Sequence, residues 1–266
     1  MNNSKIEWTS HTANLWWGCA RVHEGCDNCY AELMAKRYGH DVWGIETPRR
    51  KILSVWDDLD RYQRKAEAEK KLHRVFVGSM MDIFEKSRPL VNTNGMDIEG
   101  ETDDLRKELF QRISDDRYPN LMFLLLTKRP SNINKYIPSE WKSNPPPNVM
   151  FGTSVVNQKT FSDLVPHLLK VNGYRFLSCE PQLAPIDLKI NGNPLTGIDW
   201  VIQGGESGQR RRPFDLAWAR SMREQCKLAG IRYFFKQIDK VQEIPKNLLI
   251  RQFPTVEIPS FQEQMI

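Results

Sequence analysis

Six short apolar runs between Arg74 and Lys236 constrain the fold of this chain more than any other feature. Each run is five to seven residues long and rich in Val, Ile, Leu or Phe. The runs are Arg74–Ser79, Leu121–Thr127, Val149–Ser154, Tyr174–Cys179, Asp199–Gly204 and Arg232–Lys236. Continuous rather than alternating apolarity is typical of strands in a parallel sheet that is covered on both faces.

The stretches between these runs are mostly long enough for a crossover helix. Apolar residues recur at helical spacing in Asp104–Asp115, Thr160–Val171 and Phe214–Ala229. Strand–helix alternation predicts an α/β fold with right-handed crossovers. With one more strand expected near the N-terminus, it predicts a partial (β/α) TIM-like barrel over residues 1–240. An open doubly wound sheet is the competing topology, and residues 241–266 are expected to form a C-terminal extension.

The composition narrows the class of protein. The chain has 266 residues, of which 40% are hydrophobic and 27% charged, as in a globular protein rather than a disordered one. No apolar run approaches the roughly 18–20 residues that a membrane span needs. The N-terminus lacks the apolar core of a signal peptide, so a cytoplasmic location is expected. The net charge of +5 permits a nucleic-acid partner without requiring one.

Three of the five cysteines, Cys19, Cys26 and Cys29, form a C-x6-C-x2-C pattern. An odd number of cysteines without an export signal argues against a disulfide framework. Three thiolates from one loop suit a [4Fe–4S] cluster whose fourth iron stays open to a small molecule. A zinc site is the main alternative, and a redox C-x-x-C pair or ordinary buried thiols are the others. The fourth zinc ligand would be His23, His11 or Cys179.

Small and polar residues follow each apolar run, where a strand is expected to end. Ligands of parallel α/β folds bind at the carboxyl ends of the strands, so these residues are expected to share one rim. The expected cofactor-binding residues are Ser79, Asp82, Thr127, Lys128, Arg129, Ser154, Glu180, Gly204, Gly205, Glu206 and Lys236. The glycine pair would let the backbone approach a ligand closely, or would form an ordinary turn. The basic run Arg210–Arg212 would receive a phosphate or form a solvated loop.

Several motifs together resemble a phage-associated family of three-cysteine-motif proteins, from about Trp8 to Gln237. They are WWGCARVHEGCDNCYAELMAKR, VGSMMDIF, LLLTKRP, FGTSV, FLSCEP, WVIQGGESG and FFKQ. That family is in turn similar to the radical S-adenosylmethionine (SAM) superfamily, which implies a partial barrel with a [4Fe–4S] cluster in the loop after the first strand. The helix expected at Tyr30–Tyr38 would follow this loop.

The resemblance implies a radical SAM-type enzyme. Cys19, Cys26 and Cys29 would hold the cluster, and SAM would chelate its open iron. Reduction by a flavodoxin- or ferredoxin-like partner would cleave SAM to a 5′-deoxyadenosyl radical, which abstracts hydrogen from a substrate such as a nucleic acid or nucleotide. Lys128 or Arg129 would pair with the SAM carboxylate. Hydroxyl and carboxylate groups of the rim would bind the ribose or the amino group of SAM.

Three features depart from the superfamily pattern, and the first is that Asn28 precedes Cys29 where the usual pattern has an aromatic residue, although Tyr30 follows. The superfamily's usual cysteine spacing is C-x3-C-x2-C. Its Gly-Gly-Glu segment follows the second strand, whereas Gly204–Glu206 follow a late one, so Ser79–Asp82 hold that place here. Two alternative functions are therefore also consistent with the sequence. One is a non-catalytic zinc- or iron–sulfur-binding protein that binds nucleic acid, and the other is a DNA-repair lyase similar to spore photoproduct lyase.

Overall fold

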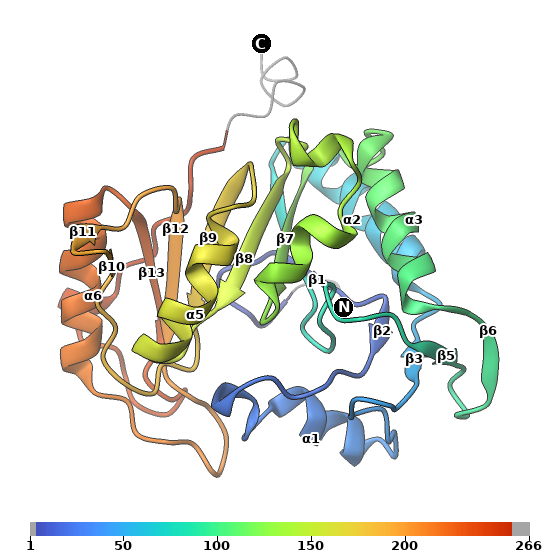
Figure 1. The fold of residues 1–266 in the computed structure, drawn as a ribbon, viewed down its shortest axis with the longest axis horizontal. Coiled ribbons are helices and arrows are strands. Elements are labelled where there is room, and N and C mark those ends of the chain that lie inside the picture. Colours follow the sequence, from blue (N-terminus) through green and yellow to red (C-terminus); the bar gives the residue numbers. More distant parts are fainter. Residues whose placement is uncertain (1–3, 257–266) are drawn as a thin grey trace.

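Seven parallel strands form the central sheet of the computed structural model, which describes residues 4–256. The strand order β1-β4-β7-β8-β9-β12-β13 follows the order of the chain. Because each strand is added at the same edge, the sheet never reverses direction as a doubly wound sheet does. The sheet curls into a half-barrel, so the predicted partial TIM-like barrel is confirmed (Figure 1).

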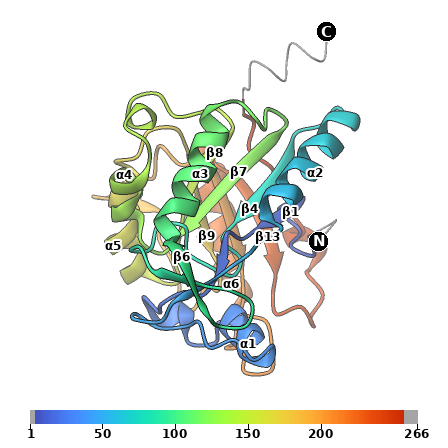
Figure 2. The same ribbon diagram turned by 90° about the vertical axis from the view of Figure 1, so that its right-hand side faces the viewer.

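The six apolar runs form strands of this sheet, and a first strand precedes them as predicted. The strands are β1 (His11–Ala13), β4 (His73–Val77), β7 (Leu121–Thr127), β8 (Val149–Ser154), β9 (Tyr174–Cys179), β12 (Trp200–Gly204) and β13 (Arg232–Gln237). The connections contain α2 (Val55–Ala68), α3 (Thr102–Ser114), α4 (Ile133–Tyr136), α5 (Gln158–Leu168) and α6 (Leu216–Ala229). These helices cover the outer face of the sheet (Figure 2). Between β9 and β12 stands a hairpin of β10 (Lys189–Ile190) and β11 (Asn193–Pro194).

Both faces of the sheet are packed, which explains the continuous apolarity of the strands. In β4, Val75 and Val77 belong to the large core beneath the helices, whereas Phe76 belongs to a second core on the inner face. The buried residues of the inner core are Trp8, Phe76, Met122, Leu124, Met150, Phe176, Trp200, Ile202 and Phe234. The half-barrel is therefore filled by large side chains along this part of its interior.

The side chains on the inner face become smaller toward the carboxyl ends of the strands. Since residues two apart in a strand point to the same face, the inner series ends in small residues on several strands. They are Gly78, Gly152, Ser154, Ser178 and Gly204. Large side chains thus fill the interior up to this level and small ones line the carboxyl rim.

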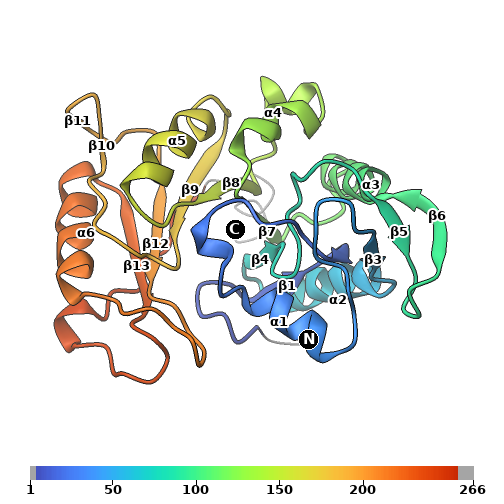
Figure 3. The same cartoon turned by 60° about the horizontal axis from the view of Figure 1, so that its bottom comes forward.

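A smaller sheet of four strands lies beside the half-barrel and was not predicted. It consists of β2 (Trp16–Trp17), β3 (Arg49–Lys51), β5 (Pro89–Val91) and β6 (Asp97–Glu101). Helix α1 (Tyr30–Arg37), predicted from the sequence, lies between β2 and β3 in the chain. Figures 1 and 3 show α1 and the cysteine loop before it crossing the carboxyl end of the half-barrel.

The described part of the expected C-terminal extension, residues 241–256, returns to β13. Arg251 forms a β-bridge with Phe234, and Leu248 is fully buried. The rest of that extension, residues 257–266, lies outside the described residues. Short 3-10 helices complete the fold at Glu24–Cys26 (η1), Pro130–Asn132 (η2), Glu140–Lys142 (η3) and Lys246–Leu248 (η4). Within residues 4–256, no helix is both long enough and apolar enough to span a membrane.

Candidate metal centre and cofactor site

The cysteine loop begins where β2 ends and reaches the carboxyl rim through Gly18. The Gly18 N–H donates to the Met80 carbonyl over 3.1 Å. Its φ of +122° is one that side-chain-bearing residues rarely adopt, and a Cβ atom would lie 2.3 Å from the Val42 carbonyl oxygen. Cys19 then pairs in a β-bridge with Trp43. The first cysteine is therefore held by the backbone on both sides.

Cys26 and Cys29 lie on two consecutive turns. Cys26 ends η1, whose N-cap is His23, and the His23 Nδ1 accepts from the Gly25 N–H over 3.1 Å. Burial, followed by the charge of Lys128, lowers the pKa of His23 to about 4, so its imidazole is neutral at pH 7. Cys29 is the N-cap of α1. The C-x-x-C pair thus spans the junction of two short helices.

The three thiols are a ligand set of the kind that an iron–sulfur cluster takes. Cys26 is 8% exposed, and Cys19 and Cys29 are partly exposed. Burial, with the nearby carboxylates of Asp82 and Glu85, raises the pKa of Cys19 to about 12. The free thiol is therefore protonated at pH 7, and a metal would displace its proton on binding.

The donor set fits a cluster, in which each thiolate ligates a different iron. Within residues 4–256, no three His, Cys, Asp or Glu side chains gather closely enough to ligate one metal ion. The described residues therefore contain no preassembled set of three metal ligands, and this holds for the three cysteines as well.

A carboxylate–arginine pair anchors the first part of the loop. The carboxylate of Asp82, which is 4% exposed, accepts from the Thr127 hydroxyl over 2.7 Å and from Arg129 Nη1 over 2.7 Å. Arg129 Nη2 donates to the Ala20 carbonyl over 2.8 Å, and Arg129 Nη1 lies 4.0 Å from Cys19 Sγ. Burial opposes the charge of Arg129, but Asp82 outweighs it and raises the pKa of the guanidinium. Arg129 thus connects the end of β7 to the segment of Cys19.

A second carboxylate–arginine pair anchors the C-x-x-C turn. The carboxylate of Glu206 accepts from Arg212 Nη2 over 2.7 Å and from Asn28 Nδ2 over 2.9 Å. Arg212 also donates to the Glu24 carbonyl over 3.2 Å. Burial opposes the ionisation of Glu206, but the hydrogen bonds from Arg212 and Asn28 outweigh it and lower its pKa. Residues after β12 therefore hold the turn between the second and third cysteines.

Other predicted rim residues are also engaged within the chain. The Ser79 hydroxyl accepts from Asn14 over 2.8 Å, and its carbonyl accepts from the Tyr30 hydroxyl over 2.8 Å. Glu180 and Lys236 form an ion pair with each other. Of the basic run, Arg211 pairs with Asp239 over 2.9 Å and Arg212 with Glu206, so these two charges already have carboxylate partners.

The two glycines after β12 have different surroundings. A Cβ atom on Gly205 would lie 2.0 Å from the Ile238 carbonyl oxygen and 2.7 Å from Phe214 Cβ. On Gly204 it would lie 3.3 Å from Gln237 Cγ, a close contact that the flexible Gln237 side chain can relieve by a small shift. Packing within the chain therefore requires glycine at position 205, where the close approach is to the protein's own backbone.

Lys128 and Ser154 remain available to a ligand. Among residues 4–256, the Lys128 ammonium makes no hydrogen bond or ion pair, yet its charge acts on both His23 and Cys19. Ser154 is buried at the end of β8, in register with Ser178 at the end of β9. The rim thus places an unpaired cation near Cys19 and His23, and two serines side by side at the ends of β8 and β9.

The sequence did not single out Asn28 or Tyr30 as functional residues, nor Arg212 as a partner of Glu206. Asn28 and Tyr30 flank Cys29, and proximity to a cysteine is the signal that identifies them. The pairing of Glu206 with Asn28 has no such signal, since 178 positions separate them.

Fold and site together define an α/β half-barrel protein with a three-cysteine loop at its carboxyl rim. The chain belongs to the family described as "Protein of unknown function (DUF5131)", which matches residues 3–252. No curated protein matches the chain, and no solved structure matches it.

Proposed function

We propose that this protein is a radical SAM-type enzyme whose [4Fe–4S] cluster is held by Cys19, Cys26 and Cys29. The observation that carries the proposal is the position of the cysteine loop. It follows β1 and β2 and crosses the carboxyl end of a half-barrel, where α/β barrel enzymes bind their ligands (Figure 3). The small inner residues of the same rim favour a bound cofactor there.

When bound, such a cluster supplies one electron to SAM, whose cleavage yields methionine and a 5′-deoxyadenosyl radical. The protein contributes orientation. The Asp82–Arg129 and Glu206–Arg212 pairs hold the loop from different parts of the rim and so restrict the segments that carry the cysteines.

Lys128 is the group we assign to the carboxylate of SAM. Arg129, the other candidate, is occupied by Asp82 and by the Ala20 carbonyl, whereas Lys128 has no partner in the described part of the chain. The hydroxyls of Ser154 and Ser178 would serve the ribose or the amino group. The proposal includes two partners. A flavodoxin- or ferredoxin-like protein would reduce the cluster, and a nucleic acid or nucleotide would be the substrate, in a phage setting.

Anaerobic reconstitution with iron and sulfide tests this function. The wild-type protein should turn brown and, with a chemical reductant, cleave SAM to 5′-deoxyadenosine. Cys26→Ala should lose colour and cleavage together. Cys226→Ala is the matched control, because Cys226 is a buried thiol of α6 far along the chain from the loop. A colourless wild-type protein with one zinc ion per chain would contradict the proposal.

A further inference from the structure

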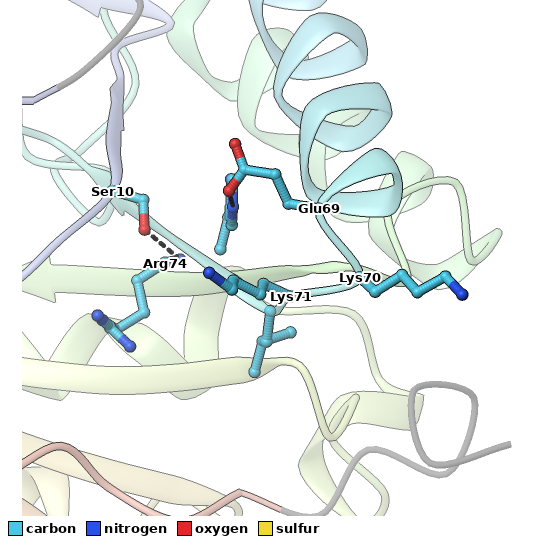
Figure 4. A pocket seen from close by; sticks show the side chains of 7 residues that line it. Ser10, Glu69, Lys70, Lys71 and Arg74 are labelled. Carbon is cyan, nitrogen blue, oxygen red and sulfur yellow. Dashed lines mark hydrogen bonds and ion pairs between the residues drawn. The ribbon is translucent and has the colours of Figure 1, made fainter. Parts of the chain in front are cut away.

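A pocket of about 560 Å³ lies at the opposite end of the half-barrel from the cysteine loop. It sits where α2 ends and β4 begins, beside the residue that precedes β1 (Figure 4). Its lining residues are Ser10, Glu69, Lys70, Lys71, Leu72, His73 and Arg74. The candidate cofactor site uses none of them, so this pocket is a separate feature of the molecule.

Arg74 is a cation of this pocket that lacks a counter-charge. Its Nε donates to the Trp8 carbonyl over 3.1 Å, and its guanidinium lies 3.8 Å from the centre of the Phe253 ring. Among residues 4–256 it forms no ion pair, and its two Nη groups make no hydrogen bond. Burial lowers its pKa to about 10, still well above neutral, so a partly buried charge remains unpaired.

The other charged groups of the pocket do not neutralise Arg74. Lys70 and Lys71 are exposed and form no ion pair within the described residues. The carboxylate of Glu69 lies 3.0 Å from Nε2 of His73, which also lines the pocket, and 3.8 Å from Lys65 Nζ, and the charge of Lys71 acts on it as well. The lining therefore carries three cations against one carboxylate.

The three basic side chains of the pocket do not all extend in the same direction. Figure 4 shows Lys71 and Arg74 extending toward the same side of the pocket, whereas Lys70 extends the opposite way. The Ser10 hydroxyl accepts from the Arg74 N–H over 3.3 Å and stays beside this pair as a further polar group. A guanidinium with free Nη groups and an ammonium on the same side of a pocket match the charge of a phosphate group, and the fork of the guanidinium matches its geometry.

We propose that this pocket binds a phosphate group, with Arg74 and Lys71 as the principal contacts. The ligand is either a small phosphorylated molecule or the backbone of a nucleic acid, because both present the same chemistry. The inference does not depend on the cysteine loop or on SAM.

Calorimetric titration of the full-length protein at low ionic strength tests the proposal, with pyrophosphate and a short single-stranded oligonucleotide as probes. Lys71→Gln should weaken binding about tenfold, since a charge-assisted hydrogen bond contributes about 1.5–3 kcal/mol. Lys70→Gln changes the net charge equally but removes a side chain that points away, so its effect should be under about threefold. Lys159→Gln, on the exposed surface of α5, should have no effect. Arg74→Gln is a weaker test, because Arg74 also packs on Phe253.

The probes distinguish the two sources of phosphate. Binding of pyrophosphate alone, weakened by Lys71→Gln, supports a small phosphorylated ligand. Tighter binding of the oligonucleotide, weakened by the same variant and by added salt, supports a nucleic-acid backbone. If neither probe binds, or if wild type, Lys70→Gln and Lys71→Gln bind equally, the proposal is overturned. Neither result bears on SAM cleavage.

Discussion

Glu206 connects two parts of the chain that the sequence keeps far apart. Its carboxylate holds Asn28, within the C-x-x-C turn, and Arg212, which in turn holds the Glu24 carbonyl. At 7% exposure the carboxylate is largely withdrawn from water, so its hydrogen bonds are stronger than those of a surface pair. The position of two of the three cysteines therefore depends on one side chain.

Glu206→Gln tests this dependence. Glutamine keeps the size but loses the charge, and the weakened bonds to Arg212 and Asn28 should lower the free energy of unfolding by about 2 kcal/mol. Chemical denaturation measures that loss. The loop should also open more often, so Cys26 and Cys29 should react faster with a thiol reagent.

Glu224→Gln is the control for this variant, because Glu224 forms an exposed pair with Arg223. This substitution should lower the free energy of unfolding by less than about 0.5 kcal/mol and should leave the reactivity of Cys26 and Cys29 unchanged. Equal thiol reactivity in Glu206→Gln and wild type would show that the carboxylate does not hold the loop.

Sequence reasoning located the candidate site but not its supports. Cys19, Cys26 and Cys29 share one loop, and polar residues at strand ends meet at one rim in any parallel barrel. Which of those residues already have partners depends on contacts such as Asn28 with Glu206, which no local pattern reveals. Asp82, Arg129 and Glu206 were predicted as cofactor-binding residues, which stays a prediction, and the structure adds that they form ion pairs whose partners contact the loop.

At the level of elements, the sequence predicted the strands of the half-barrel and missed those of the smaller sheet. Six of the seven strands of the half-barrel are local apolar runs. The strands β3 and β6 are short and charged, and β3 pairs with β2 and β5 across long stretches of chain. Their pairing is a tertiary property, so periodicity carries no signal of it.

The two glycines after β12 give a matched test of this packing. In Gly205→Ala the new Cβ atom would overlap the Ile238 carbonyl, so the backbone must shift and the protein should lose about 3 kcal/mol of stability. In Gly204→Ala the new atom would lie 3.3 Å from Gln237 Cγ and 3.5 Å from both the Gln237 carbonyl oxygen and Glu180 Oε1, so only a side chain must shift slightly and the loss should be under about 1 kcal/mol. Thermal or chemical unfolding measures both, and equal losses would contradict the packing argument.

At the scale of the whole molecule, a chain of polar contacts joins the first strand to the rest of the sheet. His11 of β1 lies 3.0 Å from His73 of β4, which lies 3.0 Å from Glu69 at the end of α2. His11 also stacks on Tyr62 of α2, with ring centres 4.0 Å apart. Because β1 is the edge strand that leads into the cysteine loop, this chain fixes the start of the half-barrel.

The burial of His11 predicts how the stability of the whole fold depends on pH. Burial, and next the charge of His73, lowers the pKa of His11 from 6.5 to about 4. Between these values the unfolded chain binds a proton that the folded chain does not, so the free energy of unfolding falls as the pH falls through this window. The full contribution of the neutral imidazole is present above pH 6.5 and amounts to at most about 3 kcal/mol. Urea unfolding from pH 7 to pH 4 should show this loss in wild type but not in His11→Gln, which keeps a donor toward His73, while the loss due to His23, whose pKa is also lowered to about 4, is common to both. His167→Gln, at an exposed position of α5, should follow wild type. Parallel profiles for wild type and His11→Gln would mean that His11 takes up its proton in the folded state as readily as in the unfolded one.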